Sequence, residues 1–159
     1  MPRTARFVID NAYYHVITRG NQRQAVFTEE EDFLKYLELL SKYKKKYKFS
    51  LFGYCLMPNH VHLMIDPNGC ANLAKVMQAI NQSYARYFNY KYRKSGHLWQ
   101  GRFKSMIINK DQYFLDCINY IECNPVRANI AKCPLDYRWS SYKSRSVGTS
   151  GSLLDLPKL

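Results

Sequence analysis

The stretch Ser50–Asp66 reads SLFGYCLMPNHVHLMID. Two mostly apolar runs flank Pro58 and Asn59, residues that favour tight turns, and this pattern predicts a β-hairpin. In a strand, side chains two residues apart point to the same side of the sheet. We therefore expect His60 and His62 to project together from one face of the second strand, which raises the question of why an otherwise apolar strand carries two imidazoles.

Regular elements are expected on both sides of this hairpin. Tyr13–Arg19 and Phe103–Asn109 have the aromatic and β-branched composition of strands. Apolar residues at helical spacing predict helices over Thr28–Phe49, Asn72–Lys94 and Lys110–Asn124. The first of these helices has Thr28 as its N-cap, and the last ends at Asn124 because proline at the next position disfavours helix.

The resulting order, β-α-β-β-α-β-α, is the split βαβ pattern of ferredoxin-like folds. We expect an α+β fold, a ferredoxin-like (RRM-like) plait, with an antiparallel sheet and helices on one face. The added C-terminal helix, which carries Tyr120, can cover part of the opposite face. Residues 1–145 are assigned to one domain. The chain after Pro134 is expected to be irregular, and residues 146–159, which include SVGTSGS, have the composition of a flexible tail.

The composition indicates a polyanionic partner. The chain has 24 Lys and Arg against 12 Asp and Glu, a net charge of +12, which favours nucleic acid or an acidic membrane surface. Its 14 Tyr, 8 Phe and 2 Trp provide rings on which unpaired bases can stack, so we expect single-stranded nucleic acid. The alternative is a protein whose surface is merely basic.

Neither a membrane span nor a disulfide framework is expected. No apolar run approaches the roughly 20 residues needed to cross a bilayer, and the N-terminal MPRTARFVID lacks the apolar core of a secretory signal. The 5 cysteines are odd in number and form no CxxC pair, which favours reduced thiols. These features predict a soluble, cytoplasmic protein with no membrane partner.

Two imidazoles on one strand face can bind one metal ion. Tyr120 and Asn124 lie four residues apart on the final predicted helix and therefore share a face. If that face meets His60 and His62, the Asn124 amide oxygen completes a ligand set suited to Mg²⁺ or Mn²⁺, and the Tyr120 hydroxyl can attack a phosphodiester beside the metal. The alternatives are two hydrogen-bonded core histidines, a packed tyrosine ring and an asparagine that only ends the helix.

Three blocks of the sequence resemble one known family. MPNHVHLMI is similar to the His-hydrophobic-His (HUH) motif of single-strand endonucleases. INYIECNPVRANI resembles the tyrosine helix of the REP-associated tyrosine transposases, and GHLWQGRF resembles a third block of that family. The blocks occur in the family order, and the similarity extends from about Tyr13 to Tyr142.

The resemblance implies a ferredoxin-like nuclease core in which His60, His62 and Asn124 bind Mg²⁺ or Mn²⁺ and Tyr120 is the nucleophile. It implies an HUH-class transposase that cleaves single-stranded DNA by transesterification, leaving a 5′-phosphotyrosine link and a free 3′-hydroxyl. No nucleotide cofactor is expected. The implied partner is single-stranded or hairpin DNA from palindromic repeats, bound by a monomer or a homodimer.

Further candidates for DNA contact are basic or aromatic and lie beside these blocks or after the first strand: Arg19, Arg23, Trp99, Arg102, Phe103, Lys104 and Arg127. The cations are expected to hold phosphates, and the two rings to stack on bases. For each of them, an ordinary surface charge or a core ring is the alternative. We expect His15 and His97 to be structural, although His15 can line the same sheet face as the histidine pair.

Two other functions are compatible with the sequence. An RRM-like module would hold nucleic acid on its open sheet without chemistry, which leaves the paired histidines as coincidence. A metal-dependent phosphodiesterase would use water, and Tyr120 would then be structural. Replacing Tyr120 by Phe separates these functions from transesterification, because only the last needs the hydroxyl group.

Overall fold

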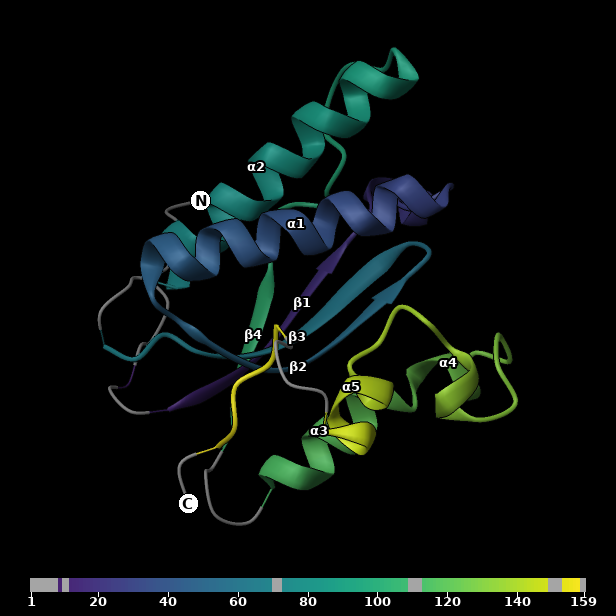
Figure 1. The fold of residues 1–159 in the computed structure, drawn as a ribbon. Coiled ribbons are helices and arrows are strands. Elements are labelled where there is room, and N and C mark those ends of the chain that lie inside the picture. Colours follow the sequence, from purple (N-terminus) through teal and green to yellow (C-terminus); the bar gives the residue numbers. More distant parts are fainter. Residues whose placement is uncertain (1–8, 10–11, 70–72, 109–112, 149–152, 158–159) are drawn as a thin grey trace.

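The computed structural model describes residues 9, 12–69, 73–108, 113–148 and 153–157, which form a four-stranded antiparallel sheet with helices on both faces (Figure 1). The strands are β1 (Tyr13–Arg19), β2 (Ser50–Met57), β3 (His60–Asp66) and β4 (Lys104–Ile108). The helices are α1 (Glu30–Tyr47), α2 (Leu73–Tyr92), α3 (Phe114–Glu122), α4 (Asn124–Arg127) and α5 (Tyr142–Val147), with short 3₁₀ turns η1 (Asn21–Arg23) and η2 (Pro134–Asp136). No helix in these ranges is long and apolar enough to cross a membrane.

The predicted hairpin is present and forms one side of the sheet. β2 pairs with β3, β3 with β1 and β1 with β4, all antiparallel, so the spatial order is β2-β3-β1-β4. A split βαβ pattern gives this order when the α1 and α2 connections lie on the same face. The predicted α+β fold with an antiparallel sheet is confirmed, and the strand order is compatible with a ferredoxin-like plait.

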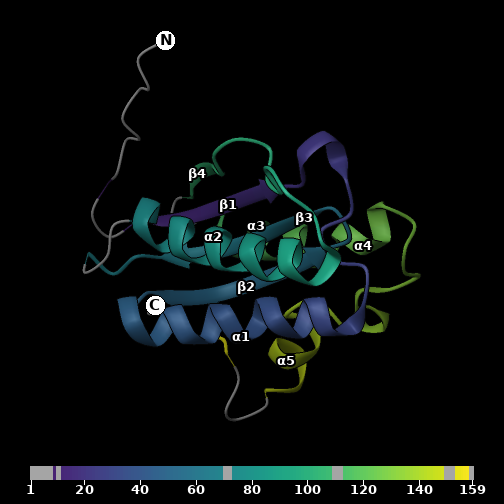
Figure 2. The ribbon, with the colours of Figure 1, turned by 90° about the horizontal axis from the view of Figure 1, so that it is seen from above.

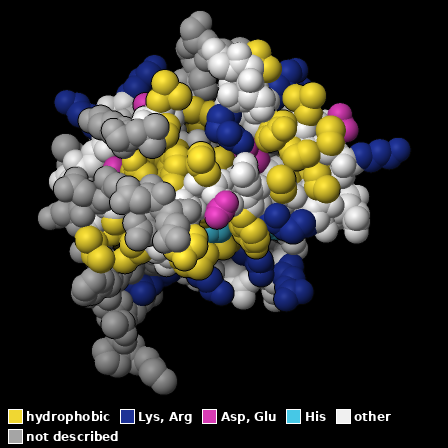
Figure 3. Space-filling view, turned by 90° about the horizontal axis from the view of Figure 1, so that it is seen from below, with side chains coloured by type: hydrophobic (Ala, Val, Ile, Leu, Met, Phe, Trp, Pro, Cys, Tyr) yellow, Lys and Arg dark blue, Asp and Glu magenta, His cyan; other side chains and the backbone are white. Residues whose placement is uncertain are grey.

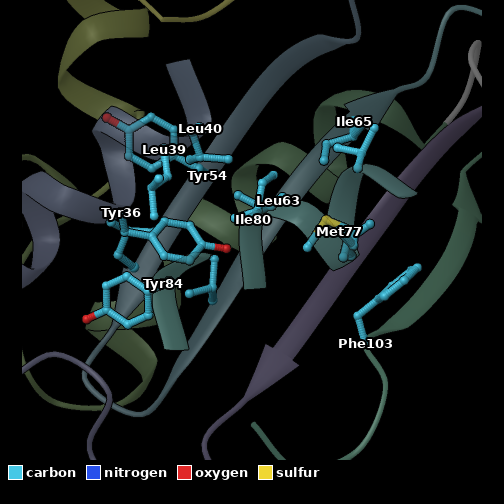
Figure 4. Close-up of a cluster of buried hydrophobic side chains, with 14 of the residues drawn as sticks. Tyr36, Leu39, Leu40, Tyr54, Leu63, Ile65, Met77, Ile80, Tyr84 and Phe103 are labelled. Carbon is cyan, nitrogen blue, oxygen red and sulfur yellow. The ribbon is translucent and has the colours of Figure 1, made fainter. Parts of the chain in front are cut away.

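α1 and α2 lie side by side over one face of the sheet and bury the main core (Figure 2). This core contains Leu63 and Ile65 from β3, Leu40 from α1 and Met77 from α2, and all four side chains are fully buried (Figure 4). Burying one such side chain contributes about 1.5–3 kcal/mol. Neighbouring residues of a strand point to opposite sides of the sheet. The packing of Leu63 into this core therefore directs His62 to the other side.

A buried carboxylate organises the start of α1. The helix begins at Glu30 with Glu29 as its N-cap, one residue later than the predicted Thr28. Asp32 Oδ2 accepts hydrogen bonds from the backbone N–H groups of Thr28 at 2.9 Å and Glu29 at 3.1 Å. The same side chain accepts a hydrogen bond from the Tyr92 hydroxyl at 2.6 Å and lies 3.0 Å from Lys91 Nζ. Asp32 therefore ties the first turn of α1 to the last turn of α2.

α3 packs on the opposite face of the sheet, where the added helix was expected. Its Ile118 and Ile121 are buried against Cys55 of β2 and Met64 of β3 in a second core. On β4, by contrast, Met106 of the same face is 50% exposed. The α3 face is therefore covered over β2 and β3 and open beside β4.

The prediction of an irregular chain after Pro134 is wrong, because this part contains α5 and pairs with the edge strand β2. Ser141 N–H donates to the Tyr54 carbonyl at 3.0 Å. Asp155, within the predicted flexible tail, donates its N–H to the Leu51 carbonyl at 2.7 Å, and its carboxylate accepts from Leu51 N–H at 2.9 Å. Free backbone groups of an edge strand attract such segments, an effect that composition does not reveal. Residues 149–152 and 158–159 of the predicted tail lie outside the described residues.

Candidate metal and tyrosine site

The register of β1 against β3 gathers a group of histidines. His62 pairs with Ile17, and His60 and His62 share the face on which α3 packs. His15 lies two residues before Ile17 and projects to the same face, where its Nε2 atom is 2.9 Å from His62 Nδ1. The ring centroids of His15 and His62 are 5.1 Å apart, and those of His60 and His62 are 4.9 Å apart. The predicted histidine pair is therefore part of a trio.

The sequence indicates only a structural role for His15, whereas the structure places it within the site. Strand alternation already puts His15 on one face with Tyr13 and Ile17. Its contact with His62 depends on which strand lies beside β1 and in what register, and this pairing is not a local property of the sequence. From the sequence, His15 could therefore be placed on a face of β1 but not beside His62.

Burial keeps these imidazoles neutral at ordinary pH. His15 and His62 are 2% and 4% exposed. Burial lowers the pKa of His15 to about 4, and burial together with the positive charge of Arg19 lowers the pKa of His60 to about 4. The pKa of His62 falls furthest, because of burial and the charges of its neighbours, including Arg127. A neutral imidazole is the form that binds metal.

Tyr120 approaches the histidines from α3. Its ring is edge-on to His15 and His62, with centroids 6.1 and 6.4 Å away. The apolar residues Ile118 and Ile121 point into the second core, while the Tyr120 side chain is 50% exposed. Tyr120 is thus no packed core ring but a side chain that a ligand can reach at the edge of the imidazole cluster.

Arg127 covers one face of the Tyr120 ring. Its Cζ lies 3.9 Å from the ring centroid, and its Nη2 donates a hydrogen bond to the Tyr120 backbone carbonyl. α4 follows α3 almost directly, because Cys123 keeps a near-helical backbone and Pro125 occupies the first turn of α4. This short turn brings Arg127 back over Tyr120, where it orients the ring and places a positive charge beside the phenol.

Asn124 begins α4 and so does not share one helix with Tyr120, contrary to the prediction. Its Nδ2 is a buried polar atom without a hydrogen-bond partner among the described residues, and a rotated amide would present its oxygen at that position. No three His, Cys, Asp and Glu side chains of the described ranges form a metal-binding group. The predicted set of His60, His62 and Asn124 has two imidazole nitrogens and one amide oxygen as its donors, and it stays a prediction.

A family model described as "Transposase IS200 like" matches residues 8–124, which include the histidine trio, Tyr120 and Asn124. The chain belongs to this IS200-like transposase family. A putative REP-associated tyrosine transposase of Haemophilus influenzae is 27% identical over 150 residues, covering 86% of this chain and 82% of the relative. A solved structure of a REP-associated tyrosine transposase bound to a REP hairpin has the same fold, with a TM-score of 0.74, 20% identity, and 98% of this chain and 95% of that one covered. The resemblance to these transposases is confirmed.

All five basic residues predicted to contact DNA are exposed on this IS200-like transposase: Arg19, Arg23, Arg102, Lys104 and Arg127. Arg19 ends β1 opposite His60. Arg102 and Lys104 line a cleft of about 560 Å³ together with Ile17 and Met106. Figure 3 shows this side of the molecule, with Lys and Arg side chains near the small exposed histidine surface. The open part of the sheet face thus combines an apolar floor with positive charge.

The structure does not bring Trp99 and Phe103 to this surface. Each is 8% exposed and belongs to the main core, where Figure 4 shows Phe103. The Trp99 Nε1–H group donates to the Asn81 carbonyl at 3.0 Å. Base stacking needs an accessible ring face, so the predicted stacking role does not fit the burial of these two rings.

α3 is anchored to α5 by an ion pair between a buried glutamate and an exposed arginine. Glu122 is fully buried, and its carboxylate lies 2.5 Å from Arg145 Nη2 of α5. It also accepts a hydrogen bond from Ser141 Oγ at 2.7 Å. Because Glu122 is two residues after Tyr120, this contact helps to fix the helix that carries the tyrosine.

Proposed function

We propose that this IS200-like transposase is a single-stranded DNA endonuclease and strand transferase that forms a 5′-phosphotyrosine link through Tyr120. The supporting observation is the half-exposed ring of Tyr120, whose centroid lies 6.1 Å from that of His15 and 6.4 Å from that of His62. Both of these imidazoles are buried and neutral. His60, His62 and Asn124 would hold Mg²⁺ or Mn²⁺, which when bound supplies polarisation of the scissile phosphodiester. This assignment makes the enzyme a metal-dependent member of the HUH class.

In this reaction the Tyr120 oxygen bonds to phosphorus and the bond from phosphorus to the 3′ oxygen breaks. The phenol loses its proton and the departing 3′ oxygen gains one, which leaves a 5′-phosphotyrosine and a free 3′-hydroxyl. Arg127, whose Cζ lies 3.9 Å from the ring centroid, would hold the Tyr120 ring in a fixed orientation for this attack. Attack of a second 3′-hydroxyl on the phosphotyrosine reverses the step and joins strands. The tyrosine ester conserves the phosphodiester linkage, so no nucleotide cofactor is needed.

The substrate we propose is single-stranded or hairpin DNA. The net charge of +12 supports a polyanionic substrate, and the solved neighbour is bound to a REP hairpin. Arg19, Arg23, Arg102 and Lys104 would contact the DNA backbone beside the tyrosine. The protein would act as a monomer or as a homodimer. The reaction would take place in the cytoplasm.

The test is covalent capture. The protein is incubated with Mn²⁺ or Mg²⁺ and a labelled library of hairpin-containing oligonucleotides, and a denaturing gel is used to detect a protein–DNA band. We expect the band in the wild type, and we expect Tyr120→Phe and His60→Ala to lose it while DNA binding is retained. Tyr113→Phe is a matched control, because Tyr113 is a 55% exposed tyrosine at the start of the same helix.

Other outcomes identify the competing functions. Cleavage that persists in Tyr120→Phe without a covalent band would show that water is the nucleophile. Tight DNA binding without cleavage under either metal would show an RRM-like binding module. Loss of the band in Tyr113→Phe as well as in Tyr120→Phe would mean that the helix, and not the Tyr120 hydroxyl group, is what the substitutions disturb.

A further inference from the structure

Both proposed metal ligands are hydrogen-bonded through the same ring atom. His60 Nδ1 lies 2.6 Å from Asn59 Oδ1, and His62 Nδ1 lies 2.9 Å from His15 Nε2. A histidine coordinates a metal through one ring nitrogen, while the hydrogen bond of the other sets its tautomer and ring orientation. In both residues Nε2 is therefore the nitrogen left to face a metal.

The direction of the His60 hydrogen bond follows from its partner. An amide oxygen only accepts, so His60 Nδ1 carries the hydrogen and Nε2 keeps its lone pair. The Asn59 amide is oriented by a second contact, because its Nδ2 donates to the Arg23 carbonyl at 3.4 Å. The backbone carbonyl of Asn59 in turn accepts a hydrogen bond from the Gly20 N–H group at 2.8 Å. The loop after β1 thus holds the side chain that orients His60.

Gly20 is needed for this approach of the loop to Asn59. A Cβ atom on Gly20 would lie 2.4 Å from the Gln24 carbonyl oxygen and 2.9 Å from Val26 Cγ1. The first distance is shorter than any ordinary contact, and its partner is backbone. The tight return of this loop from Gly20 to Val26 therefore depends on the missing side chain, and Val26 N–H in turn donates to the Pro58 carbonyl of the β2–β3 turn at 2.8 Å.

The hydrogen bond between His62 and His15 can run in either direction, because a neutral imidazole has one donor and one acceptor nitrogen. We infer that His62 Nδ1 donates to His15 Nε2, and that His15 and Asn59 are positioning residues that direct the Nε2 lone pairs of His62 and His60 toward one divalent cation. The opposite direction would put a hydrogen on His62 Nε2 and remove that atom from the ligand set. The inference rests on the proposed function for the identity of the two ligands.

The packing around His15 fits this role. The residue is 2% exposed, its ring stacks on His62 at an interplanar angle of 26°, and the centroid of the Tyr120 ring lies 6.1 Å from its own. The ring therefore has little freedom to turn, and its Nε2 stays directed at His62. Removing such a partner from a metal-bound histidine typically weakens metal binding by about 10- to 100-fold.

The tautomers can be measured without metal or DNA, by ¹⁵N-resolved NMR of the imidazole groups. The wild type should carry the hydrogen on Nδ1 in both His60 and His62. His15→Phe keeps a buried ring and removes the acceptor, so only His62 should lose this tautomer as its main form. Asn59→Ala should affect only His60. A wild-type His62 with its hydrogen on Nε2 would overturn the inference.

Binding of Mn²⁺, followed by EPR titration, gives the second readout. His15→Phe and Asn59→Ala should bind Mn²⁺ about 10- to 100-fold more weakly than the wild type. His15→Gln and Asn59→Asp keep a hydrogen-bonding atom at the critical position and should recover most of the affinity. Equal losses in the Phe and Gln variants, in parallel with equal losses of thermal stability, would show a merely structural role and overturn the inference. If His15→Phe does not fold, the two Asn59 variants provide the same comparison for His60.

The outcomes separate this inference from the proposed function. A wild type that binds no Mn²⁺ contradicts the proposed metal site and the inference with it. A wild type that binds Mn²⁺, with variants that bind equally well, overturns the positioning roles alone. Three histidine nitrogens coupled to bound Mn²⁺ in pulsed EPR would also overturn them, because His15 would then be a ligand itself; two such nitrogens support them.

Discussion

At the scale of single residues, Arg127 lies flat on the ring of Tyr120, with 3.9 Å between Cζ and the ring centroid. A guanidinium in this position orients the ring, and such contacts are worth about 0.5–2 kcal/mol. We therefore expect Arg127→Ala to slow covalent capture roughly tenfold at saturating DNA, which corresponds to about 1.4 kcal/mol. The measurement is the single-turnover rate of adduct formation on a labelled hairpin.

Two further variants show whether Arg127 acts on the tyrosine or on the DNA. Arg127→Lys keeps the charge and loses the planar stack, so its rate should be intermediate. Arg102 lines the cleft beside β4, away from the ring contact, and Arg102→Ala should weaken DNA binding with little effect on the saturated rate. If Arg127→Ala likewise weakens DNA binding with little effect on the saturated rate, then Arg127 contacts a phosphate of the DNA, as the sequence predicts.

The site residues differ in how far the sequence reveals them. His60 and His62 are evident because spacing by two on a strand is local. Tyr120 is one of 14 tyrosines, so its selection required the resemblance to a family. His15 was not assigned to the site, because its contact with His62 arises from the β1–β3 register. The stacking of Arg127 on Tyr120 was likewise not predicted, since it depends on the turn between α3 and α4.

At the scale of elements, α3 is held by the ion pair of the buried Glu122 carboxylate with Arg145, at 2.5 Å. Arg145→Met would leave a fully buried carboxylate without its cation, which typically costs about 3 kcal/mol or more. We expect that loss in the free energy of unfolding measured with urea. We also expect slower covalent capture, because α3 carries Tyr120.

A second ion pair of the same chemistry serves as the control. Arg138 and Glu30 are 2.6 Å apart, but their side chains are 61% and 58% exposed. Arg138→Met should therefore change stability by less than about 1 kcal/mol. The double variant Glu122→Gln/Arg145→Met should be more stable than Arg145→Met alone, because the unpaired charge is gone. Equal stabilities of these two variants would contradict the assignment of the loss to buried charge.

The order of the elements was predictable because periodicity is local, and the hairpin and both long helices follow it. α5 and the Asp155 contact were not predicted, since backbone hydrogen bonds to β2 help to hold these segments and the local sequence does not reveal such bonds. The core positions of Trp99 and Phe103 were also not predicted, because they too depend on tertiary packing. An aromatic residue beside a basic one suits either a core or a nucleic-acid surface, and only the packing of α1 and α2 decides between them.

At the scale of the whole molecule, Asp32 connects α1 and α2 and so supports the layer above the sheet. Burial alone would raise the pKa of its carboxyl group, but hydrogen bonds from Tyr92, from the backbone of Thr28 and Glu29, and from Lys91 outweigh burial and hold the pKa below its ordinary value of 3.8. The unfolded chain therefore takes up this proton at a higher pH than the folded one. The stabilisation by Asp32 is complete well above pH 3.8 and is lost as the pH falls below it.

Asp32→Asn should therefore lower the free energy of unfolding by about 3 kcal/mol at pH 7, because Lys91 and two backbone donors lose a charged partner. The difference from wild type should stay constant between pH 7 and 5 and shrink below pH 4, as the unfolded wild type becomes protonated. Urea titrations across this range measure it. Glu31→Gln removes an exposed partner of the same lysine and should change stability by less than about 1 kcal/mol at every pH. A gap between wild type and Asp32→Asn that widens toward acid would mean that Asp32 is protonated more readily in the folded protein than in the unfolded chain, so that its burial outweighs its hydrogen bonds.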